Sequence, residues 1–295
     1  MAERRWRWLG VLWLLALALP ALAEIRVLDD TGQTVVLPAP ARRVISLAPH
    51  VTETLFAIGA GDRLVGAVDF SDYPPAAKRL PRVGGYSRLD TERILALQPD
   101  LVVGWAGGND ADSLAMLRRL GLTLFLSEPQ RLEDMPDQFL RLGRLLGQEA
   151  AAGRLAEDFR RRLEELRRRY AGSSPVRVFY QVWDRPLITL NGEQPVSDLI
   201  RLCAGHNVFA DLTAAAPRVD IEAVLAADPQ VIIASGMGAQ RPEWLDAWRR
   251  WPELSAVRGG HLYVIDPDII QRPGPRLLQG AERMCELLER VRAGR

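Results

Sequence analysis

Trp105, Gly107 and Gly108 are the residues whose types and positions most clearly suggest ligand binding. They follow residues 101–103, a continuous Leu-Val-Val run that is typical of a strand buried on both faces of a parallel sheet. In open parallel sheets, ligands bind beyond the carboxyl ends of the strands. We therefore expect a ligand site where this indole ring stands beside flexible glycine backbone.

Residue patterns that carry catalysis are missing from the sequence. It contains neither a G-x-S-x-G nucleophile elbow nor a P-loop. The three histidines, His50, His206 and His261, are scattered and lack the spacing of metal ligands. A Ser-His-Asp triad assembled by folding stays open, but no residue is singled out for it. The sequence predicts no catalytic residue, no metal site and no cofactor, and hence a protein that is not an enzyme.

Two copies of one helix–strand unit position the candidate residues. In the first copy an aspartate caps a helix, Glu92 lies in its first turn, and Pro99 ends it before the strand. Residues 219–235 (VDIEAVLAADPQVIIAS) repeat this order, and Glu222 and Pro229 follow their counterparts at the same interval of 130 residues. Chance similarity between such units is the alternative, but the matching interval favours two similar lobes.

Strand and helix patterns alternate with short connections in both halves of the chain, which predicts an α/β protein with parallel sheets covered by helices. Residues 148–171 are different, because apolar residues recur there at spacings of three and four without proline. We expect one long helix here, with a start near residue 133 left open. At 1.5 Å per residue its length of roughly 35 Å could cross the back of two lobes. The expected lobes are residues 24–147 and 172–295, and a peripheral helix is the alternative.

The first 23 residues have the pattern of a secretory signal peptide. Three arginines precede the apolar residues 9–19, and residues 21–23 (Ala-Leu-Ala) form a small-x-small cleavage signal. The apolar part is short for a membrane span, although an N-terminal anchor helix is the alternative. Export to an oxidising compartment favours a disulfide between the two cysteines, Cys203 and Cys285, over two buried free thiols.

Composition and charge are those of an ordinary globular protein. The chain is 48% hydrophobic and 25% charged, with a formal net charge of +1. This balance gives no electrostatic argument for nucleic-acid binding. The arginine runs at residues 160–162 and 167–169 are expected to face solvent. We expect a monomer without a nucleic-acid partner.

Several segments together resemble the substrate-binding proteins of ABC importers for cobalamin, haem and ferric siderophores. The similar segments are residues 43–75 (RVISLAPHVTETLFAIGAGDRLVGAVDFSDYPP), residues 91–109 (TERILALQPDLVVGWAGGN), VFYQVWDRP, CAGHNVF and the last helix around Cys285. The similarity covers nearly the whole chain after residue 23. The SDYPP and W-x-GGN elements are fairly specific for cobalamin-type members. The resemblance thus implies cobalamin as the transported ligand, ABC importer membrane subunits as partners, and the periplasm as the compartment.

The resemblance also implies the arrangement of the lobes. It predicts two Rossmann-like lobes with mainly parallel sheets, bridged by one long α-helix, with the ligand in the cleft between them. A helical bridge should allow only small hinge motion. The family's disulfide carries over to Cys203 and Cys285.

Six residues carry over from the family's ligand site by position: Phe70, Tyr86, Trp105, Trp183, Asp268 and Arg272. The flat aromatic rings would bury the broad face of a corrin, and Asp268 could accept hydrogen bonds from the corrin amides. Core packing is the alternative for each aromatic residue. For Asp268 the alternative is a turn residue, and for Arg272 it is a structural ion pair.

Glu92 and Glu222 carry over as transporter-docking residues. In the family, one acidic residue on each lobe pairs with arginines of the importer's membrane subunits. Two equivalent acids suit a partner with pseudo-twofold symmetry. Stabilisation of the helix dipole alone is the alternative, and the two roles are compatible.

Two departures from the cobalamin-type pattern affect the expected ligand. Ala216 precedes Pro217 where relatives can present a tryptophan, and Tyr86 stands where a tryptophan is possible. Tyr86 and Arg272 keep open a haem or siderophore carrier on the same fold, since haem would require an axial Tyr or His and a siderophore an arginine cluster. An exported α/β enzyme is the hypothesis from another class.

Overall fold

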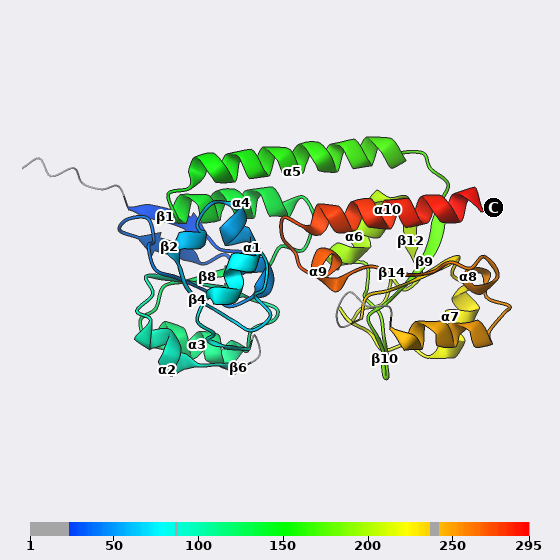
Figure 1. The fold of residues 1–295 in the computed structure, drawn as a ribbon, viewed down its shortest axis with the longest axis horizontal. Coiled ribbons are helices and arrows are strands. Elements are labelled where there is room, and N and C mark those ends of the chain that lie inside the picture. Colours follow the sequence, from blue (N-terminus) through cyan, green and yellow to red (C-terminus); the bar gives the residue numbers. More distant parts are fainter. Residues whose placement is uncertain (1–23, 86–87, 237–241, 295) are drawn as a thin grey trace, which may run out of the picture.

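The protein folds into two α/β lobes that are joined along one side by a long helix (Figure 1). The computed structural model describes residues 24–85, 88–236 and 242–294. The expected signal peptide, residues 1–23, and the candidate site residue Tyr86 lie outside the described residues. No helix in the three described ranges combines the length and the apolar character that crossing a membrane requires.

Each lobe is built on a parallel sheet, as predicted, and each of the two sheets has four strands. The first sheet has the order β4-β3-β7-β8 and the second has the order β12-β9-β13-β14, with every neighbouring pair parallel. Every residue of β3, β8 and β13 is buried, because helices cover both faces of each sheet. The strands are β3 (Val44–Ser46), β4 (Leu64–Ala67), β7 (Leu101–Trp105), β8 (Leu124–Ser127), β9 (Val176–Gln181), β12 (Gly205–Asn207), β13 (Val231–Ala234) and β14 (Leu262–Val264).

The repeated helix–strand unit occupies the same place in both lobes. Helix α2 (Thr91–Ala96) precedes β7 and helix α7 (Ile221–Ala227) precedes β13, and each of these strands is third in the order of its sheet. The side chains of Asp90 and Asp220 each accept a hydrogen bond from the backbone N–H three residues further on, at 3.0 and 2.7 Å. Each cap satisfies an N–H group that the start of a helix leaves unpaired. The two lobes are therefore alike in topology, as the sequence repeat predicts.

Helix α5 (Glu149–Tyr170) runs for 22 residues along the back of both lobes (Figure 1). It lies beside α4 (Asp134–Leu145) on the first lobe and beside α10 (Leu277–Ala293) on the second. Gly147, with a φ of 56°, separates α4 from α5 by a left-handed turn that glycine adopts without strain. The long bridging helix that the sequence predicts is thus present, and α4 is a separate helix before it.

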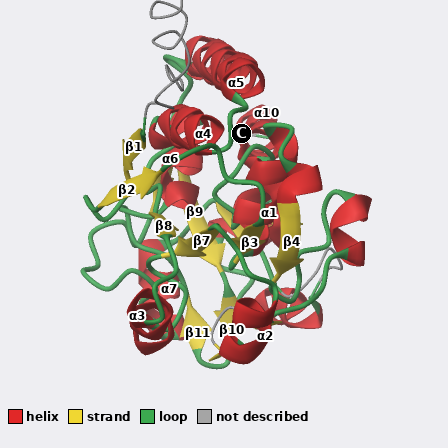
Figure 2. Cartoon of the chain, turned by 90° about the vertical axis from the view of Figure 1, so that its left-hand side faces the viewer, coloured by secondary structure: helices red, strands yellow, loops and turns green. Residues whose placement is uncertain are grey.

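The apolar side of α5 joins the two lobes into one hydrophobic core. Leu155 of the predicted apolar stripe is half-buried. The other four residues of the stripe are buried: Phe159, Leu163, Leu166 and Tyr170. The same apolar cluster contains Phe139 of α4 and Met284 of α10. Separate clusters lie on the opposite faces of the two sheets. Figure 2 shows the first of these sheets between α4 on one side and α2 and α3 on the other.

Arginines of α5 reach neighbouring helices, although the sequence predicts that they only face solvent. Arg160 lies 2.7 Å from Asp137 of α4, and Arg162 lies 2.6 Å from Glu282 of α10. These side chains are 30% exposed or more, so each pair contributes at most about 1 kcal/mol. The shared apolar core therefore holds α5 more strongly than these ion pairs do.

Shorter elements complete the two lobes. The other helices are α1 (Pro49–Ala57), α3 (Ala111–Arg119), α6 (Pro195–Leu202), α8 (Ser255–Arg258) and α9 (Pro267–Ile270), with 3-10 turns at Gly61–Arg63, Pro75–Arg79 and Glu243–Arg250. Antiparallel hairpins are formed by β1 (Ile25–Leu28) with β2 (Thr34–Leu37), β5 (Gly84–Gly85) with β6 (Arg88–Leu89), and β10 (Trp183–Asp184) with β11 (Leu187–Ile188).

Cys203 and Cys285 form the predicted disulfide. Both residues are fully buried, and the bond joins the end of α6 to α10 within the second lobe. The bond closes a loop between residues 82 positions apart, which stabilises the fold by about 4 kcal/mol in the chain-entropy view.

Candidate functional site

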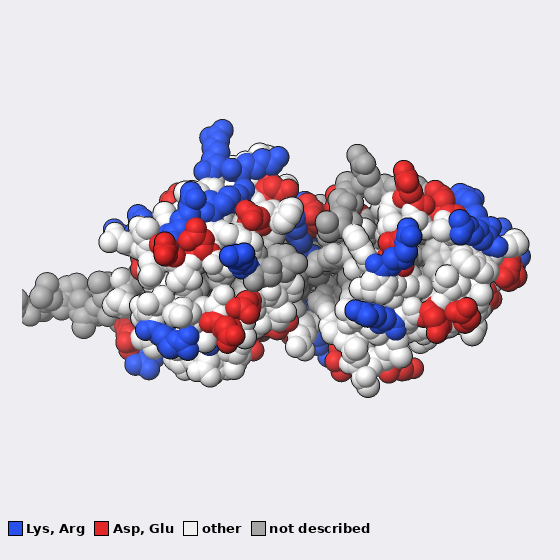
Figure 3. Space-filling model, turned by 90° about the horizontal axis from the view of Figure 1, so that it is seen from below, with Lys and Arg blue, Asp and Glu red and all other residues white. Residues whose placement is uncertain are grey.

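The carboxyl ends of two central strands of the first lobe lie at its junction with the second lobe. Helix α1 begins shortly after β3, and Trp105 is the last residue of the neighbouring strand β7. Seen from the side of α2 and α7, the surface is hollowed between the two lobes (Figure 3). Because ligands of parallel sheets bind beyond the carboxyl ends of the strands, this junction is the candidate site.

A buried carboxylate ties the two lobes together at the junction. Glu53, on α1 of the first lobe, has a side chain that is only 3% exposed. Its Oε1 accepts hydrogen bonds from Arg272 at 2.8 Å and from Arg276 at 2.7 Å, and its Oε2 accepts a second bond from Arg276 at 2.7 Å. Both arginines belong to the second lobe. A charge buried to this degree requires such partners, because the loss of its hydration is otherwise uncompensated.

Arg272 also forms ion pairs with carboxylates of both lobes. Its guanidinium group lies 2.8 Å from Asp268 and 3.2 Å from Asp72. The guanidinium group of Arg276 lies 3.9 Å from the centre of the Tyr73 ring, within the range of a cation–π contact. Asp72 and Tyr73 belong to the SDYPP motif, which therefore contacts the second lobe. Arg272, a predicted ligand-site residue, is engaged in ion pairs between the lobes.

The loop after β7 holds Trp105 through its own residues and the neighbouring strand. The Asn109 side chain accepts a hydrogen bond from the Trp105 N–H at 2.7 Å and donates one to the carbonyl of the residue after β3 at 2.9 Å. The Gly107 N–H donates to Glu128 at 2.5 Å, and the Trp105 side chain hydrogen-bonds to the same carboxylate. A Cβ at Gly108 would lie 2.0 Å from the Trp105 ring. The W-x-GGN motif is thus one interlocked loop.

His50 lies between the two lobes and packs on Trp105. The ring centres are 5.4 Å apart and the ring planes are nearly perpendicular, at 89°. The His50 residue is 3% exposed, and its Nε2 has no hydrogen-bond partner in the described structure. Burial, reinforced by the positive charge of Arg272, lowers the pKa of His50 to about 3. The imidazole is therefore neutral at ordinary pH.

Trp105 and Asp268 are brought to the same junction by these contacts. Trp105 packs on His50, His50 lies within the electrostatic reach of Arg272, and Arg272 pairs with Asp268. The Asp268 side chain remains 32% exposed. Burial raises the pKa of Asp268, and neighbouring carboxylates add to the effect, although Arg272 opposes it. Asp268 therefore keeps an accessible carboxyl group beside the interlobe ion pairs.

Phe70 and Trp183 are the most exposed of the predicted aromatic residues that the structure describes. Phe70 is 69% exposed, and its φ of 63° is a strained conformation for a residue with a side chain. Its carbonyl oxygen lies 3.4 Å from Arg272, which places Phe70 at the junction. Trp183 is 38% exposed and belongs to the hairpin labelled β10 in Figure 1, where its indole N–H donates to the Arg185 carbonyl at 3.1 Å. Trp183 thus stands on the second lobe, apart from the ion-pair cluster.

Glu92 and Glu222 lie in the first turns of α2 and α7. Both side chains are on exposed residues, and neither forms an ion pair with another described residue. Helices α2 and α7 stand on the two lobes at the edge that faces away from α5 (Figure 1). Helices α2 and α7, which carry the two glutamates, are therefore on separate lobes and on the same side of the molecule as the hollow.

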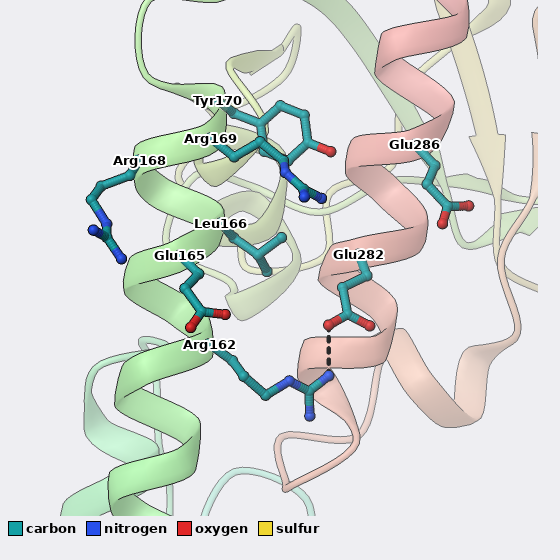
Figure 4. A pocket seen from close by; sticks show the side chains of 8 residues that line it. All are labelled: Arg162, Glu165, Leu166, Arg168, Arg169, Tyr170, Glu282 and Glu286. Carbon is teal, nitrogen blue, oxygen red and sulfur yellow. Dashed lines mark hydrogen bonds and ion pairs between the residues drawn. The ribbon is translucent and has the colours of Figure 1, made fainter.

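A second hollow, of about 700 Å³, lies between α5 and α10 on the opposite side (Figure 4). Its lining mixes charges of both signs, and one arginine there pairs with a glutamate across the hollow: the lining residues are Arg162, Glu165, Leu166, Arg168, Arg169, Tyr170, Glu282 and Glu286. Six of these eight side chains are charged, whereas the sites of large organic ligands are lined mainly by apolar and aromatic side chains. The junction beside Trp105 is therefore the better candidate.

Four residues of the junction were not predicted from the sequence: Glu53, His50, Arg276 and Glu128. A glutamate among the buried residues of α1 was the one available signal for Glu53. The partners of Glu53 lie more than 200 residues away in the sequence, so no local pattern identifies them. Glu128 follows β8 and becomes recognisable only when β8 is placed beside β7.

Comparison with known proteins adds independent information. The family model described as periplasmic binding protein matches residues 44–269. The vitamin B12-binding protein of Vibrio cholerae serotype O1 is 41% identical over 253 residues, which cover 85% of this chain and 91% of that protein.

Solved structures have the same two-lobed architecture. The crystal structure of the periplasmic vitamin B12 binding protein of Vibrio cholerae matches with a TM-score of 0.79 and 40% identity, covering 86% of this chain and 98% of that one. A periplasmic heme-binding protein from Roseiflexus sp. RS-1 matches with a TM-score of 0.76 and 24% identity, covering 85% of this chain and 99% of that one. At this lower identity the second likeness concerns the fold alone.

Replacement of Glu53 tests the buried ion pairs between the lobes. We expect Glu53→Gln to lower the free energy of unfolding by about 3 kcal/mol, because two arginines are left buried beside an uncharged group. Glu165→Gln is the matched control, since Glu165 pairs with Arg161 on the exposed face of α5 and should cost less than about 1 kcal/mol. Urea unfolding measures the free energy of unfolding of both variants. Equally small decreases in the two variants would contradict the assigned role of Glu53.

The lowered pKa of His50 predicts a specific dependence of stability on pH. Below pH 6.5 the unfolded chain binds a proton at this histidine, whereas the folded protein does not until about pH 3. The contribution of neutral His50 is therefore complete above pH 6.5 and decreases as pH falls towards 3. In His50→Phe, the free energy of unfolding should therefore fall less steeply with decreasing pH than in the wild type. The difference in slope should be up to about 1.4 kcal/mol per pH unit. His206→Phe, at an exposed position, should keep the wild-type slope of unfolding free energy against pH. If the two variants gave parallel curves of unfolding free energy against pH, His50 would not be the source of this pH dependence.

Proposed function

The chain belongs to the periplasmic binding protein family, and from this membership we propose that it captures cobalamin between its lobes and delivers it to the membrane subunits of an ABC importer. Members of this family bind and hand over a ligand without changing it, so the protein is not an enzyme. The relatives named vitamin B12-binding protein support cobalamin as the ligand, since the one from Vibrio cholerae is similar over 91% of its length.

The observation that carries the proposal is the position of Trp105 at the junction of the lobes. A corrin is a large ring with apolar faces and amide groups along its rim. In the proposed complex, Trp105, Phe70 and Trp183 cover these faces, together with Tyr86. Burial of each large apolar side chain contributes about 1.5–3 kcal/mol. The interlocked W-x-GGN loop supports this role, because a fixed ring loses little conformational freedom when ligand binds.

Polar recognition is assigned to Asp268 and Arg272. The accessible carboxyl group of Asp268 accepts hydrogen bonds from amide groups on the corrin rim. Arg272 is held by three carboxylates, so in this proposal it fixes Asp268 and the width of the site more than it attracts an anion. Such a neutralised arginine is better suited to an amide-edged corrinoid than to an anionic siderophore.

Glu92 and Glu222 are the proposed docking residues. Their exposure, their lack of an intramolecular ion-pair partner among the described residues, and their location on separate lobes support binding to two arginine-bearing membrane subunits. Equivalent charges on topologically equivalent helices match a partner that presents the same surface twice. Export through a cleaved signal peptide at residues 1–23 completes the proposal, because docking requires the protein to reach the periplasm.

Ligand identity is tested by titrating the mature protein, residues 24–295, in a calorimeter. We expect cyanocobalamin to bind much more tightly than haem or a ferric siderophore. Trp105→Ala should weaken cyanocobalamin binding at least tenfold, or about 1.4 kcal/mol, because it removes the ring at the strand end. Trp251→Ala, in the outer core of the second lobe, is the control and should leave affinity unchanged. Tighter binding of haem than of cyanocobalamin would contradict cobalamin as the ligand. Unchanged affinity of Trp105→Ala for cyanocobalamin would contradict the proposed role of Trp105 in binding.

Docking is tested by separating transport from binding. Glu92→Ala combined with Glu222→Ala should strongly reduce cobalamin uptake in cells while leaving ligand affinity intact, since neither side chain lies at the junction. Asp112→Ala combined with Glu243→Ala is the matched control, because these are also exposed first-turn carboxylates, one in each lobe. Normal uptake by the first double variant, or equal loss in both, would contradict the docking role.

A further inference from the structure

His50 is a polar residue at the junction to which neither the family resemblance nor the proposed ligand contacts give a role. It lies in the first turn of α1, immediately beyond the carboxyl end of β3. The neighbouring strand β7 ends in Trp105, and the His50 ring packs edge-to-face on the Trp105 indole. The residue is therefore at the centre of the first lobe's ligand-facing edge.

The Nε2 atom of His50 is buried and lacks a hydrogen-bond partner among the residues that the structure describes. Buried polar groups in native proteins are nearly always paired, and leaving one unpaired is costly. A residue chosen only to fill space beside Trp105 would be an apolar one. The unpaired nitrogen therefore indicates a partner that arrives from outside the chain.

The surroundings of His50 define the chemistry of that partner. Arg272 stands on the other side of the junction, but Glu53, Asp72 and Asp268 already neutralise it. These three carboxylates disfavour an anionic group at the same place. The imidazole is neutral, since burial and Arg272 lower its pKa to about 3. The Nε2 of a neutral imidazole is either an acceptor or a donor, depending on the tautomer. An uncharged amide satisfies either form.

We infer that His50 is a specificity-determining residue of the ligand site, whose Nε2 forms a hydrogen bond with a peripheral amide of the bound corrinoid. The inference rests on the proposed function and extends it. In the free protein, side chains at the junction of the lobes shield the nitrogen. When the ligand enters beside Trp105, it displaces these side chains without separating the lobes, and its amide supplies the missing partner. Ligands that carry carboxylates along the rim are disfavoured at the same position.

Replacement of His50 by phenylalanine distinguishes this role from packing. His50→Phe keeps an aromatic edge against Trp105 and removes the unpaired nitrogen. At pH 7 we expect the free variant to unfold at the same or a higher urea concentration than the wild type, because no buried polar atom is left unpaired. Its affinity for cyanocobalamin should fall about fivefold, the equivalent of about 1 kcal/mol. His206→Phe, at an exposed position, should change neither quantity.

The outcomes separate this inference from the function on which it rests. Wild-type protein that fails to bind cyanocobalamin would refute the proposed function itself. Wild-type binding with unchanged affinity in His50→Phe would refute the role of His50. A corrin absorption spectrum that shifts on binding to wild type but not to His50→Phe would indicate coordination of cobalt by the imidazole, and would also overturn the inference.

A second pair of variants decides the question if His50→Phe folds poorly. His50→Gln retains a group that can pair with an amide, whereas His50→Leu retains only apolar volume. We expect His50→Gln to bind cyanocobalamin at least threefold more tightly than His50→Leu when both are equally stable in urea. Equal affinities of the two variants would contradict the inference.

Discussion

The burial of one carboxylate between the lobes constrains the rest of the structure. Glu53 is almost completely removed from solvent, so it must be paired, and its partners Arg272 and Arg276 come from the other lobe. The lobes cannot separate at this point without breaking three charge-assisted hydrogen bonds. On the opposite side of the junction, α5 contributes its apolar stripe to a core that both lobes share. The two contacts together fix the spacing of the lobes, and hence the width of the hollow between them.

The fixed junction explains why unfavourable local features persist beside it. Phe70 adopts a left-handed backbone conformation, and the Nε2 of buried His50 is unpaired. Such features are destabilising by themselves and are usually found where function requires them. Here they lie near Trp105 and Asp268, in the place where a ligand would contact both lobes. The stability supplied by the shared core and the buried ion pairs allows a preformed site, and a preformed site binds with a smaller loss of conformational freedom.

The sequence predicts those parts of the candidate site that depend on neighbouring residues. Trp105 was recognised because its strand, its glycines and Asn109 are consecutive, and the same loop is closed by hydrogen bonds among them. The repeated helix–strand unit marks Glu92 and Glu222 as equivalent positions, and their docking role, which comes from the family resemblance, stays a proposal. Glu53 and Arg276 are not predicted, because their pairing depends on how two lobes dock and leaves no periodic pattern in either segment. Arg272 is predicted as a ligand-site residue, with a structural ion pair as the alternative, and the structure places it in ion pairs between the lobes.

The central claim is that two lobes, held at a set distance, enclose a corrinoid at the junction beside Trp105. A crystal structure of residues 24–295 with cyanocobalamin tests this claim most directly. We expect the corrin to lie between the lobes against Trp105, with Glu53 still bonded to Arg272 and Arg276. A corrin bound elsewhere, for example in the hollow between α5 and α10, or a bound state in which Glu53 has separated from both arginines, would contradict it.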